Sequence, residues 1–210
     1  MSTRAREQAT QTIEIGTPHG PARAHLLTVP RAAGSVALGH GAGGGVSAPD
    51  LTAATRAANA AGFTAVLIEQ PYRVAGRRSQ PPARQLDSAW IAAVRQLQTD
   101  ELITGRLILG GRSAGARVAC RTAEELGAAA VLCLAFPLHP PGKADDPSKS
   151  RLGELEAVRV PTLVIQGDRD PFGRPGPGPQ RQVVLVAGNH SLRSTGRIEE
   201  TVGQWLRERT

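Results

Sequence analysis

The chain has 210 residues and a formal net charge of +7. Its length suits one domain with a substantial core, which Ala, Val, Leu and Ile must fill because only 3% of residues are aromatic. The basic residues, nearly all arginine, are spread along the chain and alternate with acids, so we expect no nucleic-acid partner. No apolar run is long enough to span a bilayer, so we expect no membrane partner either.

Terminal and cysteine patterns set the remaining expectations about compartment and organisation. Residues 1–10 lack the apolar stretch of a signal peptide, so we expect a disordered or frayed N-terminus and a cytoplasmic protein. Residues 11–210 show no repeat and no domain boundary, which predicts a single domain. Cys120 and Cys133 lie in apolar surroundings without metal-ligand spacing, so we expect buried free thiols and no metal site. The sequence leaves open whether the protein is a monomer or a homodimer.

The first half of the chain begins with two short strands and then alternates strands with helices. Its predicted strands are 11–16, 22–29, 35–38 and 63–68, the first two forming an antiparallel pair. One helix is expected to begin near Pro49, capped by Ser47 or Ala48, and to end before Gly62. Residues 73–85 are rich in Arg, Pro and Gly and predict an exposed loop.

The second half continues the alternation of strands and helices. Its predicted strands are 106–109, 129–135, 162–166 and 182–186, and its predicted helices are 86–97, 114–126, a short one at 151–158 and a closing one at 198–206. Residues 137–150 and the proline-rich 171–179 are expected to be loops. The whole pattern predicts an α/β fold, a mostly parallel twisted sheet with helices on both faces.

A serine flanked by glycines follows the strand at 106–109, in the order Gly111-Arg112-Ser113-Ala114-Gly115. A nucleophilic serine must project from a sharp strand-to-helix turn, where small neighbours relieve crowding and the helix N–H groups face the site. The motif alone also fits a glycine-rich loop with an incidental N-capping serine. Because ligands of a parallel sheet bind beyond the carboxyl ends of its strands, the residues at other strand ends decide between the two interpretations.

Three other strand ends carry residues that a serine nucleophile requires. A serine hydroxyl needs a base, and His190 in the loop after the last strand is the best placed of five histidines. An acid must orient that histidine, and Asp168 and Asp170 compete for the role. Asp170 is favoured because a loop needs a few residues to reach across, and Pro171 would stiffen it. Asp168 could instead bind the backbone of the turn.

The glycine-rich HGAGGG after the strand at 35–38 predicts an oxyanion hole. The N–H of Ala114 is one expected donor and the N–H of Ala42 the other. A phosphate-binding loop is the alternative, but the segment lacks the Gly-Lys-Ser/Thr ending of a P-loop. The dinucleotide-binding alternative would use Glu69, which does not stand in a convincing strand-end context. We therefore expect no cofactor.

Five segments together resemble the α/β-hydrolase superfamily, and more narrowly its small dienelactone-hydrolase-like branch. They are LGHGAGGG, GGRSAGARVA, FPLHPPGK, VPTLVIQGDRDPFG and AGNHSL, and the similarity runs from about residue 12 to the C-terminus. That branch includes bacterial hydrolases and the hydrolase-like domain of a regulatory subunit of the non-specific-lethal histone acetyltransferase complex. The resemblance implies a Ser113, Asp170 and His190 triad and acyl chemistry free of metal and cofactor. The chain departs from the family in PFGRPGPGPQRQ, which is too rich in Pro and Gly for the usual helix.

These observations predict a serine hydrolase that cleaves carboxylic esters of small or medium-sized molecules. No cap domain fits between residues 136 and 160, so we expect an open site. The expected pocket neighbours, which follow strand ends or lie in the serine turn, are Tyr72, Arg73, Arg112, Phe136 and His139. The alternative is an α/β-hydrolase fold used as a non-catalytic binding or scaffold protein, because the fold alone does not establish activity.

Overall fold

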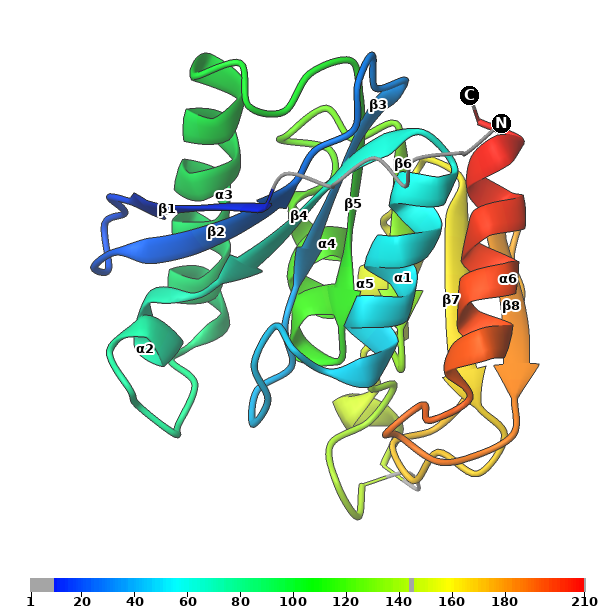
Figure 1. The fold of residues 1–210 in the computed structure, drawn as a ribbon. Helices are drawn as coiled ribbons and strands as arrows, with labels where there is room; N and C mark the ends of the chain where they lie inside the picture. Colours follow the sequence, from blue (N-terminus) through cyan, green and yellow to red (C-terminus); the bar gives the residue numbers. More distant parts are fainter. Residues whose placement is uncertain (1–9, 144–145, 210) are drawn as a thin grey trace.

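A computed structural model describes residues 10–143 and 146–209, which form one eight-stranded sheet with helices on both faces (Figure 1). The strands are β1 Thr10–Ile15, β2 Ala22–Leu27, β3 Gly34–Gly39, β4 Phe63–Glu69, β5 Arg106–Arg112, β6 Ala130–Leu134, β7 Thr162–Gly167 and β8 Arg181–Val186. The helices are α1 Pro49–Ala60, α2 Pro71–Val74, α3 Ala83–Thr99, α4 Ala114–Thr122, α5 Leu152–Glu156 and α6 Thr195–Arg207, with a 3₁₀ turn at Pro147–Lys149.

The strand order is β1-β2-β4-β3-β5-β6-β7-β8. Strand β2 pairs antiparallel with β1 and β4, and all strands from β3 to β8 run parallel. The carboxyl ends of β3, β5, β7 and β8 therefore meet at one edge of the sheet, where ligands of such sheets bind. The fold class predicted from the sequence is confirmed.

Two apolar layers cover the sheet. Helices α1 and α6 pack against each other on one face, with Trp205 in that layer, and they lie side by side in Figure 1. Helices α3, α4 and α5 cover the other face, where Trp90 is fully buried. Strands β3, β6 and β7 are buried along their whole length, which explains their continuous apolar sequences.

Several element boundaries differ from the sequence prediction. The expected loop 73–85 contains the end of α2 and the start of α3, because Pro71 presets the φ of a first helical turn. Helix α4 ends at Thr122 rather than at residue 126. Strand β5 extends three residues further, to Arg112. The expectation of a frayed N-terminus falls on residues 1–9, outside the described residues, but Thr10 belongs to β1.

The connection from β7 to β8 contains no helix between Asp168 and Gln180, as its Pro and Gly content predicted. Among the described residues, no helix is long and apolar enough to cross a membrane. The segment between β6 and β7 holds only the 3₁₀ turn and α5 among its described residues. No cap domain therefore covers the carboxyl edge from this side, and the prediction of a fold without a cap is confirmed.

Candidate active site

Ser113 lies on a sharp turn between β5 and α4. Its backbone has φ 54° and ψ −110°, a conformation that residues other than glycine rarely adopt. Such a conformation indicates strain in the backbone. A Cβ on Gly111 would lie 2.5 Å from the carbonyl oxygen of Gly39, and one on Gly115 would overlap the same oxygen. The two glycines are therefore required because β3 passes so close to the turn, as the sequence pattern implied.

Ser113, His190 and Asp170 form a continuous chain of hydrogen bonds. His190, in the loop between β8 and α6, has its Nε2 3.0 Å from Ser113 Oγ and its Nδ1 2.8 Å from Asp170 Oδ2. The Asp170 side chain is fully buried and that of His190 is 17% exposed, so the imidazole faces a little solvent and the carboxylate none. This is the geometry in which an acid orients an imidazole that accepts the serine proton.

The structure distinguishes the two candidate acids. Asp170 contacts His190, whereas Asp168 Oδ1 accepts the backbone N–H of Gly188 at 2.9 Å. Asp168 thus holds the turn at the end of β8, the local role that was its alternative. A Cβ on Gly167 would lie 2.5 Å from the carbonyl oxygen of Asn189, so glycine lets the acid loop and the base loop approach.

Two residues around the acid and base were missed by the sequence analysis. Phe172 donates its backbone N–H to Asp170 Oδ1 at 2.9 Å, and its ring lies against the His190 ring with centroids 4.2 Å apart. Its position two residues after Asp170 was the available signal. Gln166 Nε2 donates a hydrogen bond to Asp170 Oδ2 at 2.8 Å and so helps to fix the direction of that carboxyl group. Nothing in the sequence marked Gln166, because it lies inside β7.

The glycine-rich segment after β3 is held by His40 and Tyr72. His40 Nδ1 lies 2.9 Å from the carbonyl oxygen of Gly41, and Nε2 accepts the backbone N–H of Gln70 at 3.0 Å. These two contacts assign the Nδ1-protonated neutral ring, and burial lowers the pKa of His40 accordingly. Tyr72 donates its hydroxyl to the carbonyl oxygen of Ala42 at 3.0 Å. Ala42, an expected oxyanion donor, is thereby tied to α2.

The five residues expected to neighbour the pocket differ in burial and in the segments that they contact. Tyr72 is buried beside the Ala42 loop, and burial raises the pKa of its hydroxyl. Arg73 is half-buried in α2, with Nη1 3.5 Å from the carbonyl oxygen of Arg77. The half-buried His139 donates its backbone N–H to the carbonyl oxygen of Phe172, which places it next to the acid loop.

The structure also places the last two expected neighbours, and one of them, Phe136, requires correction. Phe136, which follows Ala135 with its φ of 48°, is completely buried in the core and does not line an open site. Arg112 directs its guanidinium into the protein, where it contacts Asp50 and the carbonyl oxygen of His190. Its Nε and Nη2 thus have hydrogen-bond partners within the protein.

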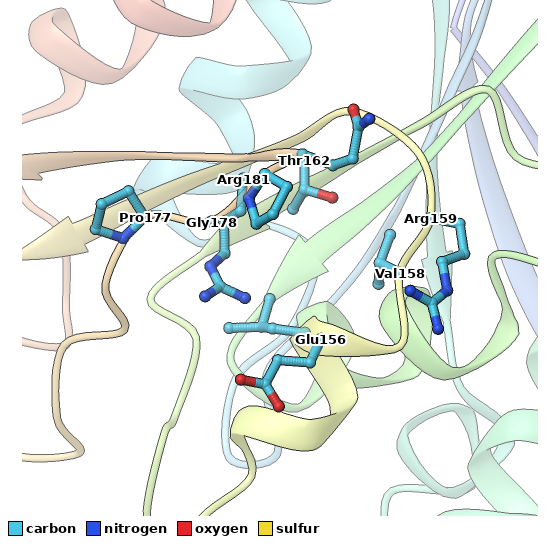
Figure 2. Close-up of a pocket in the computed structure, with 10 residues that line it drawn as sticks. Glu156, Val158, Arg159, Thr162, Pro177, Gly178 and Arg181 are labelled. Carbon is cyan, nitrogen blue, oxygen red and sulfur yellow. The ribbon is translucent and has the colours of Figure 1, made fainter.

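A cavity of about 440 Å³ lies at the opposite edge of the sheet, at the amino ends of β7 and β8. Figure 2 shows Thr162 and Arg181, the first residues of these strands, together with Glu156 and Arg159 around it. Its lining contains no serine, cysteine or histidine. The cavity is therefore separate from the hydrogen-bonded triad in position and in chemistry.

Comparison with known proteins agrees with this architecture. A family model described as an α/β hydrolase domain matches residues 32–209, so the chain belongs to the α/β hydrolase family. The resemblance seen in the sequence motifs is confirmed at that level. No curated protein sequence matches the chain.

Solved structures with the same fold come from several microorganisms. A serine hydrolase without a lid from Xanthomonas campestris is 22% identical, with 93% of this chain and 94% of that chain covered and a TM-score of 0.71. An esterase from Pyrococcus furiosus is 14% identical over 99% and 94% of the two chains, with a TM-score of 0.77. Est1E from Butyrivibrio proteoclasticus, seen with ferulic acid bound, is 16% identical over 93% and 98%, with a TM-score of 0.72. At these identities the likeness shows the fold.

Proposed function

We propose that this protein is a serine hydrolase that cleaves carboxylic esters of small or medium-sized molecules through an acyl-enzyme. The observation that carries the proposal is the unbroken contact from Ser113 Oγ through the His190 ring to Asp170 Oδ2. Membership of the α/β hydrolase family and the likeness to solved esterases support the same reaction class.

Acylation starts at the serine hydroxyl. Ser113 Oγ attacks the ester carbonyl carbon while its proton passes to His190 Nε2, and Asp170 stabilises the imidazolium that forms. The carbonyl oxygen becomes an oxyanion, which the backbone N–H groups of Ala42 and Ala114 stabilise. Ala114 is the first residue of α4, where N–H groups have no partner within the helix. The imidazolium then protonates the departing alcohol oxygen, which leaves an ester on Ser113.

Deacylation reverses these roles with water. His190 Nε2 takes a proton from a water molecule, whose oxygen attacks the acyl carbon, and the same two N–H groups stabilise the second oxyanion. Collapse of this intermediate breaks the bond to Ser113 Oγ, which recovers its proton from His190. The carboxylic acid product leaves and the free enzyme returns.

A fluorophosphonate probe and a panel of p-nitrophenyl esters test the proposal. We expect the wild type to be labelled and to hydrolyse a short ester, and Ser113→Ala to lose both activities. The matched control is Ser148→Ala, because Ser148 is exposed and its Oγ contacts only Asp146 in the described structure. A correctly folded wild type with neither labelling nor turnover would contradict the proposal and favour the non-catalytic scaffold.

A further inference from the structure

Arg112 occupies a special position, because it is the last residue of β5 and directly precedes Ser113. Its Nε lies 2.9 Å from Asp50 Oδ2, and its Nη2 donates to the carbonyl oxygen of His190 at 3.0 Å. Its Nη1 lies 2.8 Å from where a Cβ on Gly41 would stand, so the guanidinium also fills the space beneath the glycine-rich loop. One side chain thus contacts three segments of the site.

Asp50, in the first turn of α1, fixes the direction of that guanidinium. Its side chain is fully buried, and its other oxygen, Oδ1, accepts the backbone N–H of Leu51 at 2.9 Å. Burial raises the pKa of Asp50, while the charge of Arg112 opposes that shift. A buried carboxylate needs a counter-charge, so Asp50 holds Arg112 in place instead of leaving it free to turn toward solvent.

The contact with His190 is the part that bears on catalysis. Arg112 donates a hydrogen bond to the backbone carbonyl of His190, while the His190 ring bridges Ser113 and Asp170. The planar fork of an arginine can donate to Asp50 and to His190 at the same time and in fixed directions. The backbone next to the nucleophile is therefore tied to the backbone that carries the base.

We propose that Arg112, oriented by Asp50, is a positioning residue that sets the distance between the nucleophile Ser113 and the base His190. This inference rests on the proposed function. Buried ion pairs often add little net stability, so a purely stabilising role can be separated experimentally from a positioning one.

Two variants separate the roles. Arg112→Lys keeps a cation beside Asp50 and so keeps the buried charge paired, but it lacks the fork that reaches His190 as well. The double variant Arg112→Met with Asp50→Asn removes both charges, leaves no lone buried ion, and keeps an acceptor for the Leu51 N–H. We expect both proteins to fold and to melt near the wild-type temperature.

The measurement is the second-order rate of fluorophosphonate labelling at Ser113, together with kcat and KM for a short p-nitrophenyl ester. Because small misplacements of reacting groups are costly, we expect labelling and kcat to fall about 10- to 100-fold in both variants, with KM little changed. Arg121→Lys is the matched control, because the Arg121 side chain is about as exposed as that of Arg112, contacts Asp87 and Glu154, and touches none of the triad residues. It should label at the wild-type rate.

The outcomes distinguish this inference from the function on which it rests. If folded Arg112→Lys and the double variant label as fast as the wild type, the positioning role is wrong while the hydrolase stands. If the double variant does not fold, Arg112→Lys alone decides, since its buried charge stays paired. If the wild type labels no faster than Ser113→Ala, the proposed function is wrong and the positioning role falls with it.

Discussion

The carboxyl edge of the sheet holds a hydrogen-bonded cluster of polar side chains, whereas the amino edge holds a cavity. At the carboxyl edge, Ser113, His190 and Asp170 are joined by hydrogen bonds, and glycines let neighbouring loops approach within contact of one another. At the amino edge, a cavity of about 440 Å³ is lined by Glu156, Arg159 and other residues, none of which is a serine, cysteine or histidine. The comparison teaches that a cavity by itself does not carry the proposed chemistry, whereas a strained turn with ordered hydrogen-bond partners supports it.

Removal of the base should have the largest effect on the carboxyl edge. We expect His190→Ala to lower kcat/KM for a short ester by about 10⁴-fold or more, because the serine loses the group that accepts its proton. His25→Ala is the control, since His25 on β2 contacts Thr12 and Glu69 and no triad residue. Equal losses in the two variants would show that histidine removal acts through folding, and unchanged activity in His190→Ala would contradict the triad.

An added methyl group should destabilise the protein at the serine turn but not in α5, near the amino edge. We expect Gly115→Ala to destabilise the protein by about 1–3 kcal/mol and to slow labelling of Ser113, because the added carbon overlaps the carbonyl oxygen of Gly39. Gly153→Ala in α5 meets no atom within 4 Å and should stabilise by about 0.5–1 kcal/mol. Urea unfolding of both variants measures the difference. A Gly115→Ala protein as stable as the wild type would contradict the close packing of β3 on the turn.

The buried His40, at the carboxyl edge of the sheet, should make the free energy of unfolding depend on pH. Burial lowers its pKa below the usual 6.5, so the unfolded chain binds more protons, and the free energy of unfolding falls as the pH drops below 6.5. The slope cannot exceed about 1.4 kcal/mol per pH unit for this one group. His40→Gln keeps an acceptor for the Gln70 N–H but does not titrate. We expect a weaker pH dependence in this variant, measured by urea unfolding at about pH 7.5 and pH 5.5; identical slopes would contradict it.

A substitution at the amino edge should have little effect on stability or on ester hydrolysis. We expect Arg159→Ala, which alters the lining of the cavity in Figure 2, to change stability by less than about 0.5 kcal/mol and to leave ester hydrolysis at the wild-type rate. Thermal melting and steady-state kinetics measure both quantities. A large loss of activity in a stable Arg159→Ala protein would mean that the cavity takes part in the reaction, and the contrast between the edges would fail.

Local sequence chemistry was enough to predict the alternation of strands and helices and the positions where the triad candidates leave the sheet. Glycines around Ser113 marked a tight turn, and His190 stood out because the chain has only five histidines. The choice between Asp168 and Asp170 depended on the path of one turn, which spacing does not determine. In the structure Asp168 accepts the Gly188 N–H, and Asp170 is the one that contacts His190.

Directions of side chains and long-range partners were beyond the reach of the sequence. Phe136 follows a strand end, as pocket residues do, but its side chain is fully buried in the core after a residue, Ala135, with a positive φ that the sequence does not signal. Arg112 meets Asp50 across 62 positions of sequence, and no periodicity connects the two. The role of Gln166 is equally hidden, because an amide inside a buried strand gives the same local pattern whether or not it faces an acid.

The position of β3 between β4 and β5 has a consequence for how the protein is made. Chains emerge from the ribosome N-terminus first, but β3 has both neighbours only after residue 112 has been synthesised, although its own residues end at Gly39. The serine turn then waits a further 77 residues for His190. A nascent chain thus carries Ser113 early and acquires His190 late, so the proposed hydrolysis could begin only after the last strand of the sheet has been synthesised.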